Sequence, residues 1–178
     1  MKILDFALVV GKLKGLKRTG WVRSGIPNPE SVADHTLRLT ILAMFLAPTV
    51  GANSEKSVKM ALIHDLAEAT TGDIVTNIGT KSLNNHKEKV QTERAALKQI
   101  LSLVDAHEYN SLFEEYLENE TVEAQLVHQL DKLEMAIQAY EYEHDHKIKL
   151  NEFFVNARLH IQDAQFIKIM DEIEKLRL

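Results

Sequence analysis

The sequence contains no cysteine. This absence excludes a disulfide framework and any metal site built from thiolate ligands. The chain also has no apolar stretch close to the roughly 20 residues that a membrane-spanning helix needs. The first six residues carry an early acidic side chain and no small-residue cleavage site, so they predict no signal peptide. We therefore expect a soluble, cytoplasmic protein with no membrane partner.

Glycine and proline are missing from more than half of the chain. All seven glycines and all three prolines lie at or before Gly79, so residues 80–178 contain neither. Tight turns between strands depend on these two residues, and no segment shows a convincing alternation of apolar and polar side chains. The sequence thus predicts an all-α protein, with residues 1–178 forming a single-domain helical bundle.

An excess of positive charge is also absent. The chain has 26 acidic residues against 21 lysines and arginines, a net charge of −5. Proteins that bind a nucleic-acid backbone usually carry a basic face, so we expect no nucleic-acid partner. A small anionic substrate remains compatible, because a few cations in a pocket can act against the overall sign.

Apolar residues at helical spacing, together with capping and breaking residues, predict the helices. Residues 15–30 are expected to be irregular, Ser31 to cap a helix, and a loop to follow Asp73. The expected helices span residues 1–14, 31–45, 54–69, 85–103, 106–118, 121–144, 149–160 and 163–177.

Ionisable residues interrupt three otherwise apolar helical stripes. His35 lies among Val32, Leu39, Leu42 and Leu46, the His64-Asp65 pair lies in MALIHDLA (60–67), and Asp131 lies between Val127 and Met135. Each alone could be a hydrogen-bonded core histidine or a carboxylate paired with lysine or arginine. Together, two imidazoles and two carboxylates suit a divalent metal such as Mn, Co, Fe or Zn. The predicted metal ligands are therefore His35, His64, Asp65 and Asp131.

A second His-Asp pair provides a contrast. His144-Asp145 lies among charged neighbours in EYEHDHK (141–147). That setting favours a solvated helix end over a ligand pair.

Two further carboxylates lie close to the His-Asp motif in sequence. Glu68 comes three residues after Asp65 and four after His64, so on a continuous helix it shares their face. From there it could take a proton from the attacking water or position that water; the alternative is a surface glutamate. Asp73 follows Gly72 just past this helix and could lean back over the same site, or serve only in the turn.

These histidine and aspartate positions resemble the pattern of the HD-domain superfamily, a histidine followed by a His-Asp pair and a distant aspartate. The similarity runs from about residue 3 to residue 170 and is closest to the HD-domain 5′-deoxynucleotidases. Five segments carry it: RTGWV (18–22), PESVADH (29–35), HDLAE (64–68), GDI (72–74) and QLDKLEM (129–135).

The resemblance implies hydrolysis of deoxyribonucleoside 5′-monophosphates to deoxynucleosides and phosphate, usually by a homodimer. It implies that Glu68 is the general acid or base and that Asp73 contacts the sugar 3′-hydroxyl. Arg18 and Trp21 match the motif that holds the phosphate and crowds the ribose 2′ position. A second divalent ion, Mg or Mn, is implied near Glu68, Asp73 and Ile74.

The chain departs from the better-studied bacterial members at the phosphate motif. Thr19-Gly20 separates Arg18 from Trp21, which are adjacent in those relatives.

The chemistry of the predicted site suits a phosphohydrolase, because hydrolysis of a phosphate dianion requires charge neutralisation and a supply of hydroxide. A divalent metal lowers the pKa of its water, and an arginine can neutralise the remaining charge through two parallel hydrogen bonds.

Other functions remain open from the sequence. An HD-type phosphohydrolase could act on a cyclic nucleotide, a nucleoside triphosphate or an alarmone. Alarmone hydrolases usually have an acidic pair at this point, yet Ala69 follows Glu68, and the segment 15–23 offers only three basic residues for a triphosphate. A non-catalytic binding module is disfavoured because all four ligands are present.

Overall fold

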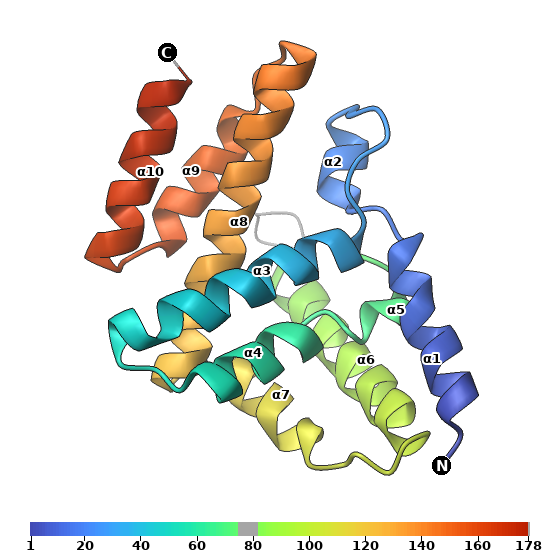
Figure 1. The fold of residues 1–178 in the computed structure, drawn as a ribbon. Coiled ribbons are helices and arrows are strands. Elements are labelled where there is room, and N and C mark those ends of the chain that lie inside the picture. The colour runs from blue at the N-terminus through green and yellow to red at the C-terminus, as the bar shows by residue number, and fades with distance from the viewer. Residues whose placement is uncertain (75–81, 178) are drawn as a thin grey trace.

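A computed structural model shows a protein built from helices (Figure 1). It describes residues 1–74 and 82–177, without the side chains of residues 82–86. Within these residues there is no β-strand, which confirms the all-α prediction, and β-pairing is limited to an isolated bridge between Lys17 and Ser31. The α-helices are α1 (Ile3–Gly11), α2 (Thr19–Arg23), α3 (Val32–Leu46), α4 (Ser54–Ile63), α5 (Glu68–Thr71), α6 (Ser82–Ser102), α7 (Tyr109–Glu118), α8 (Val122–His146), α9 (Asn151–His160) and α10 (Ala164–Leu176), with 3₁₀ turns η1 (Lys12–Lys14) and η2 (Ala47–Val50).

Helices α3, α4 and α8 form the centre of the molecule, and each packs against the other two. Helices α9 and α10 lie on one side of this group, whereas α1, α5 and α6 lie on the other (Figure 1). None of the described helices is both long enough and apolar enough to span a membrane. The predicted metal ligands come from α3, from the end of α4 and from α8, so the packing of these three helices decides whether the ligands meet.

A reciprocal cap fixes the start of α3. The hydroxyl of Ser31 accepts a hydrogen bond from the backbone N–H of Asp34 at 3.1 Å, and the carboxylate of Asp34 accepts one from the backbone N–H of Ser31 at 2.8 Å. His35 therefore lies in the first turn, fully buried on the same face as Leu39 and Ala43. Leu42 and Leu46, the last two residues of the predicted stripe, are only partly buried.

The predicted continuous helix over residues 54–69 is wrong, because α4 ends at Ile63. The next turns are tighter, with hydrogen bonds between residues three apart, including Glu68 N–H to the Asp65 carbonyl at 3.0 Å. Nδ1 of His64 contacts the Ala61 carbonyl at 2.7 Å, the oxygen that a continuing α-helix would pair with the next N–H. In such turns side chains three residues apart lie above one another. Glu68 is therefore aligned with Asp65, and it is not placed relative to His64 as it would be on a continuous α-helix.

The prediction that residues 15–30 are irregular is also wrong in part, because α2 forms within them. This short helix has no side-chain cap of its own; instead the carboxylate of Asp73 accepts the N–H of Thr19 at 2.5 Å. The other predicted helices begin and end within about three residues of the observed ones, the usual precision of such boundaries. The loop predicted after Asp73 lies largely outside the described residues.

Candidate metal and phosphate site

The four predicted metal ligands converge at the centre of the helical group. Nε2 of His35 lies 3.2 Å from Oδ1 of Asp131 and 3.9 Å from Oδ2 of Asp65, and Nε2 of His64 lies 3.0 Å from that same Asp65 oxygen. Ligand atoms of His35, His64 and Asp131 all lie within 4.8 Å of one another. Residues almost 100 positions apart in sequence thus face one point.

The two imidazoles are oriented as metal ligands. Nδ1 of His64 contacts the carbonyl of Ala61, and Nδ1 of His35 contacts the carboxylate of Glu134. Each Nδ1 therefore holds its proton toward an acceptor. The Nε2 atoms of both rings are buried without a hydrogen-bond partner of proper geometry. Ligating histidines show this arrangement, one nitrogen anchored and the other directed at the ion, so the residues present fit a divalent metal.

Opposing effects determine the charge on His35. Burial and nearby Arg18 disfavour its protonated form, but Glu134 and Asp131 outweigh them and raise the pKa of His35 to about 9. A cation bound at Nε2 has to displace a proton from this ring.

The ligand carboxylates are held in their charged form. Burial opposes ionisation of Asp65, but His64, Arg18 and His35 keep its pKa well below the usual range. Burial likewise opposes ionisation of Asp131, whose pKa is held low by Lys132, His35 and Arg18. The guanidinium of Arg18 lies 3.4 Å from Asp65 and 3.9 Å from Asp131. A cation that can bind phosphate therefore stands beside the candidate metal ligands.

Glu68 is buried beside these carboxylates. Its side chain is 4% exposed and its Oε2 atom has no hydrogen-bond partner. Burial, followed by the charges of Asp65 and Asp73, raises the pKa of Glu68 to about 10. A carboxyl group that keeps its proton at neutral pH next to a cation site is suited to proton transfer.

Asp73 connects the loop after α5 to the Arg18 segment. Besides accepting the N–H of Thr19 through its carboxylate, its backbone carbonyl accepts the Thr19 hydroxyl at 2.7 Å. Ile74, the next residue, is 40% exposed. The structure thus brings Asp73 to the same end of the site as Arg18.

Comparisons with known proteins show the family of this chain. The model of the HD domain matches residues 10–174. The chain belongs to the HD-domain family. It is 36% identical over 98% of its length to the 5′-deoxynucleotidase HDDC2 of Homo sapiens, of which it covers 86%. It is 37% identical over 98% of its length to HDDC2 of Dictyostelium discoideum, of which it covers 97%. A conserved hypothetical protein of known structure from Pyrococcus furiosus is 38% identical, with a TM-score of 0.78 and coverage of 97% of this chain and 99% of that one.

Trp21 lies inside the core of this HD domain. Its side chain is 1% exposed, its ring stacks on Phe153 with centroids 4.2 Å apart, and its Nε1–H donates to Glu30 at 2.8 Å. Tyr142 packs edge-on against the same ring. The contact of Trp21 with a ribose stays a prediction, whereas its packing against Phe153 and Tyr142 is a feature of the structure.

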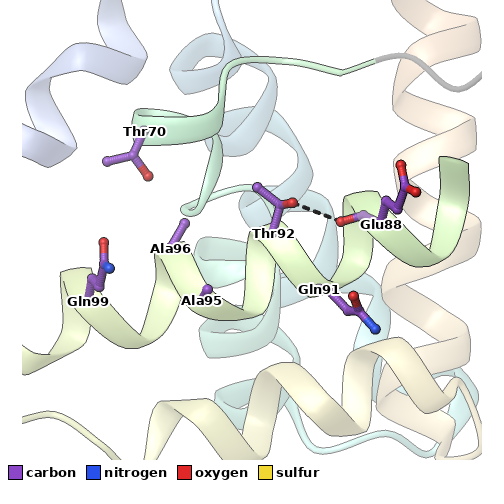
Figure 2. Close-up of a pocket in the computed structure, with 7 residues that line it drawn as sticks. All are labelled: Thr70, Glu88, Gln91, Thr92, Ala95, Ala96 and Gln99. Carbon is purple, nitrogen blue, oxygen red and sulfur yellow. Dashed lines mark hydrogen bonds between the residues drawn. The ribbon is translucent and has the colours of Figure 1, made fainter.

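The remaining surface features lie apart from the HD motif. His144 and Asp145 are exposed, with side chains 69% and 66% accessible, as the charged neighbours predicted. An open groove of about 560 Å³ runs along α6, with Thr70 of α5 also lining it (Figure 2). None of the candidate ligands lines this groove, and the hydroxyl of Thr92 within it is already bonded to the Glu88 carbonyl at 2.8 Å.

Sequence reasoning missed Glu134 as part of the site. This residue is fully buried on α8, one turn after Asp131, and contacts both His35 and Arg38. The signal was present in the QLDKLEM segment (129–135), because a second acid three residues after a ligand on a buried helix shares its face.

Proposed function

We propose that this protein is a metal-dependent 5′-deoxynucleotidase that hydrolyses deoxyribonucleoside 5′-monophosphates to deoxynucleosides and phosphate. The observation that carries the proposal is the meeting of two buried Nε2 atoms, two ionised carboxylates and Arg18 at one point. The names of relatives sharing about 36% of its residues support the substrate class. Residues 1–178 would act as one domain in the cytoplasm.

His35, His64, Asp65 and Asp131 would hold the metal, which is Co, Mn, Fe or Zn in this proposal. When bound, such an ion polarises a phosphoryl oxygen and lowers the pKa of a water. A second ion, Mg or Mn, would bind near Glu68, Asp73 and Ile74 and share the phosphate charge. The convergent donor atoms of His35, His64 and Asp131 support the first site. The negative charges of Asp65 and Asp73 near Glu68 support the second.

The chain's own side chains would supply the other functions. Arg18 would bind the phosphate and neutralise its charge, because its guanidinium already lies among the acids that face the site. Glu68 would act as general acid or base: its protonated carboxyl would donate to the leaving 5′-oxygen, and once ionised it would take a proton from the attacking water. Asp73 would contact the sugar 3′-hydroxyl. We assign Trp21 to support of the Arg18 segment, since its ring is almost fully covered.

We also propose that the enzyme is a homodimer. Leu37, Ile41, Met44 and Phe45 form an exposed apolar stripe on α3, with 46–68% of each residue accessible, and such a stripe suits a second copy. Sedimentation of Phe45→Glu against the wild type tests this, with the equally exposed Val155→Glu as control. If Phe45→Glu is still a dimer, the apolar stripe on α3 is not the dimer interface.

A metal-supplemented phosphate-release assay tests the activity itself. It compares dAMP, AMP, a cyclic nucleotide and dATP at equal concentration. We expect dAMP to be hydrolysed best, with a preference over AMP of about tenfold or more in kcat/KM, the scale of one misplaced hydroxyl. Preference for the cyclic nucleotide or dATP would move the protein to another class of HD phosphohydrolase, and equal rates for dAMP and AMP would reject deoxynucleotide specificity.

A further inference from the structure

Glu134 is a fully buried acid to which the proposed function assigns no role. Its Oε2 atom contacts Nδ1 of His35, and its Oε1 atom accepts a hydrogen bond from Nε of Arg38 at 2.9 Å. One carboxylate therefore joins a candidate metal ligand to an arginine at the edge of the core.

Arg38 is bonded to several acceptors on α8 besides Glu134. Its guanidinium also donates to Gln138 at 2.5 Å and to Glu141 at 2.9 Å. A buried carboxylate is costly unless it is paired and hydrogen-bonded, and Arg38 meets that requirement. Arg38 thus gives the carboxylate a fixed partner besides His35.

A second acid also approaches His35 but is otherwise engaged. Glu30, His35 and Glu134 form a group whose ligand atoms lie within 4.8 Å of one another. Oε1 of Glu30 accepts the indole N–H of Trp21, and Glu134 makes the contact with Nδ1. Glu30 is thus engaged with Trp21, whereas Glu134 is the acid in contact with Nδ1 of His35.

We propose that Glu134 is a positioning residue of the metal centre, which accepts the Nδ1 proton of His35 and thereby directs Nε2 at the metal. Arg38 sets the position of Glu134. A carboxylate in this place orients the imidazole and makes it a stronger donor, whereas His64 relies on the backbone carbonyl of Ala61. The inference rests on the proposed metal site and assigns to it a residue that touches neither metal nor substrate.

The test is the affinity of metal-stripped protein for Co²⁺, measured by calorimetry at a temperature well below the melting point of each variant. We expect Glu134→Gln to bind Co²⁺ about 10- to 100-fold more weakly, the usual effect of removing such a partner from a ligating histidine. Glu174→Gln is the matched control, because it removes a carboxylate from an arginine, Arg158, that lies outside the group formed by His35, Glu134 and Arg38. It should bind Co²⁺ as the wild type does.

Activity separates positioning from a loss of structure. At saturating Co²⁺ we expect Glu134→Gln to recover most of its kcat with an unchanged KM for dAMP, because Glu134 does not reach the substrate. Should Glu134→Gln fail to fold, Glu134→Asp serves instead: it keeps the charge for Arg38 but withdraws the oxygen from Nδ1, and should weaken Co²⁺ binding.

Two results overturn the inference alone: a folded Glu134→Gln with wild-type Co²⁺ affinity, or an equal loss of affinity in Glu174→Gln. Asp65→Ala is the reference for the underlying site and should bind no Co²⁺ while remaining helical. If the wild type itself binds no metal, or Asp65→Ala binds it normally, the proposed function and this inference both fail.

Discussion

Asp73 and Thr19, 54 residues apart, are joined by two hydrogen bonds, from the Thr19 N–H to the Asp73 carboxylate at 2.5 Å and from the Thr19 hydroxyl to the Asp73 carbonyl at 2.7 Å. Thr19 directly follows Arg18, the candidate phosphate ligand. The loop after α5 therefore supplies the acceptor for the first N–H of α2 and fixes the segment from which Arg18 reaches the metal ligands.

Asp73→Ala should lower stability and raise the KM for dAMP. Loss of an acceptor at a helix N-terminus costs about 1 kcal/mol, and a looser Arg18 segment binds phosphate less well. Asp73→Asn is the control, because asparagine caps about as well as aspartate and should keep the stability. Retention of full activity in Asp73→Asn would limit Asp73 to the capping role, whereas loss of activity at normal stability would indicate that the carboxylate acts on the substrate or a second ion.

Glu68→Gln should keep the metal but lower kcat by a factor on the order of 10² or more, because an amide cannot transfer the proton. Metal content by mass spectrometry and kcat for dAMP measure the two effects. Glu88→Gln, an exposed position on α6, should change neither. A Glu68→Gln protein that has lost its metal would show that Glu68 is a ligand.

Trp21→Phe separates packing from substrate selection. It retains most of the ring volume but leaves half-buried Glu30 without the indole N–H, which should cost roughly 1–3 kcal/mol of stability. Since Trp21 is 1% exposed, we expect the ratio of kcat/KM for dAMP over AMP to persist. A ratio that narrows by about tenfold or more would restore the role in crowding the ribose 2′ position.

Glu143→Gln should destabilise the C-terminal helices in a pH-dependent way. The hydrogen bond from Arg177, opposed by burial and aided by the N–H of Leu150, lowers the pKa of Glu143. A carboxyl whose folded pKa lies below its unfolded value stabilises the fold above the unfolded value, near 4.5, and that stabilisation disappears as the pH falls through the folded pKa.

Urea unfolding at a series of pH values measures this effect. At pH 7 the free energy of unfolding should be lower in Glu143→Gln by roughly 1.5–3 kcal/mol, the scale for a hydrogen bond to a charged group. The difference from the wild type should shrink in acid. Glu172→Gln, exposed on α10, should match the wild type throughout, and a difference for Glu143→Gln that is constant with pH would contradict the assignment.

The sequence alone determined the features that depend on neighbours within a few turns. The spacing of apolar residues and the Ser31 cap predicted α3, and the absence of glycine and proline after Gly79 excluded most alternatives to helices. Charges that interrupt apolar stripes identified His35 and Asp131 as candidate ligands, because burial of an isolated charge needs a compensating partner. These predictions use only the pattern of residues within each single helix.

Only the tertiary structure decided which residues from different helices meet. The sequence could not show that Asp73 caps α2, that Trp21 is covered by Phe153, or that Glu134 contacts His35 from 99 residues away. The end of α4 at Ile63 could not be predicted from the sequence either. At this break Nδ1 of His64 contacts the Ala61 carbonyl, and Nε2 faces the other ligands. Local patterns fix which face of a helix is buried, whereas the partner on the other side depends on how all the helices pack.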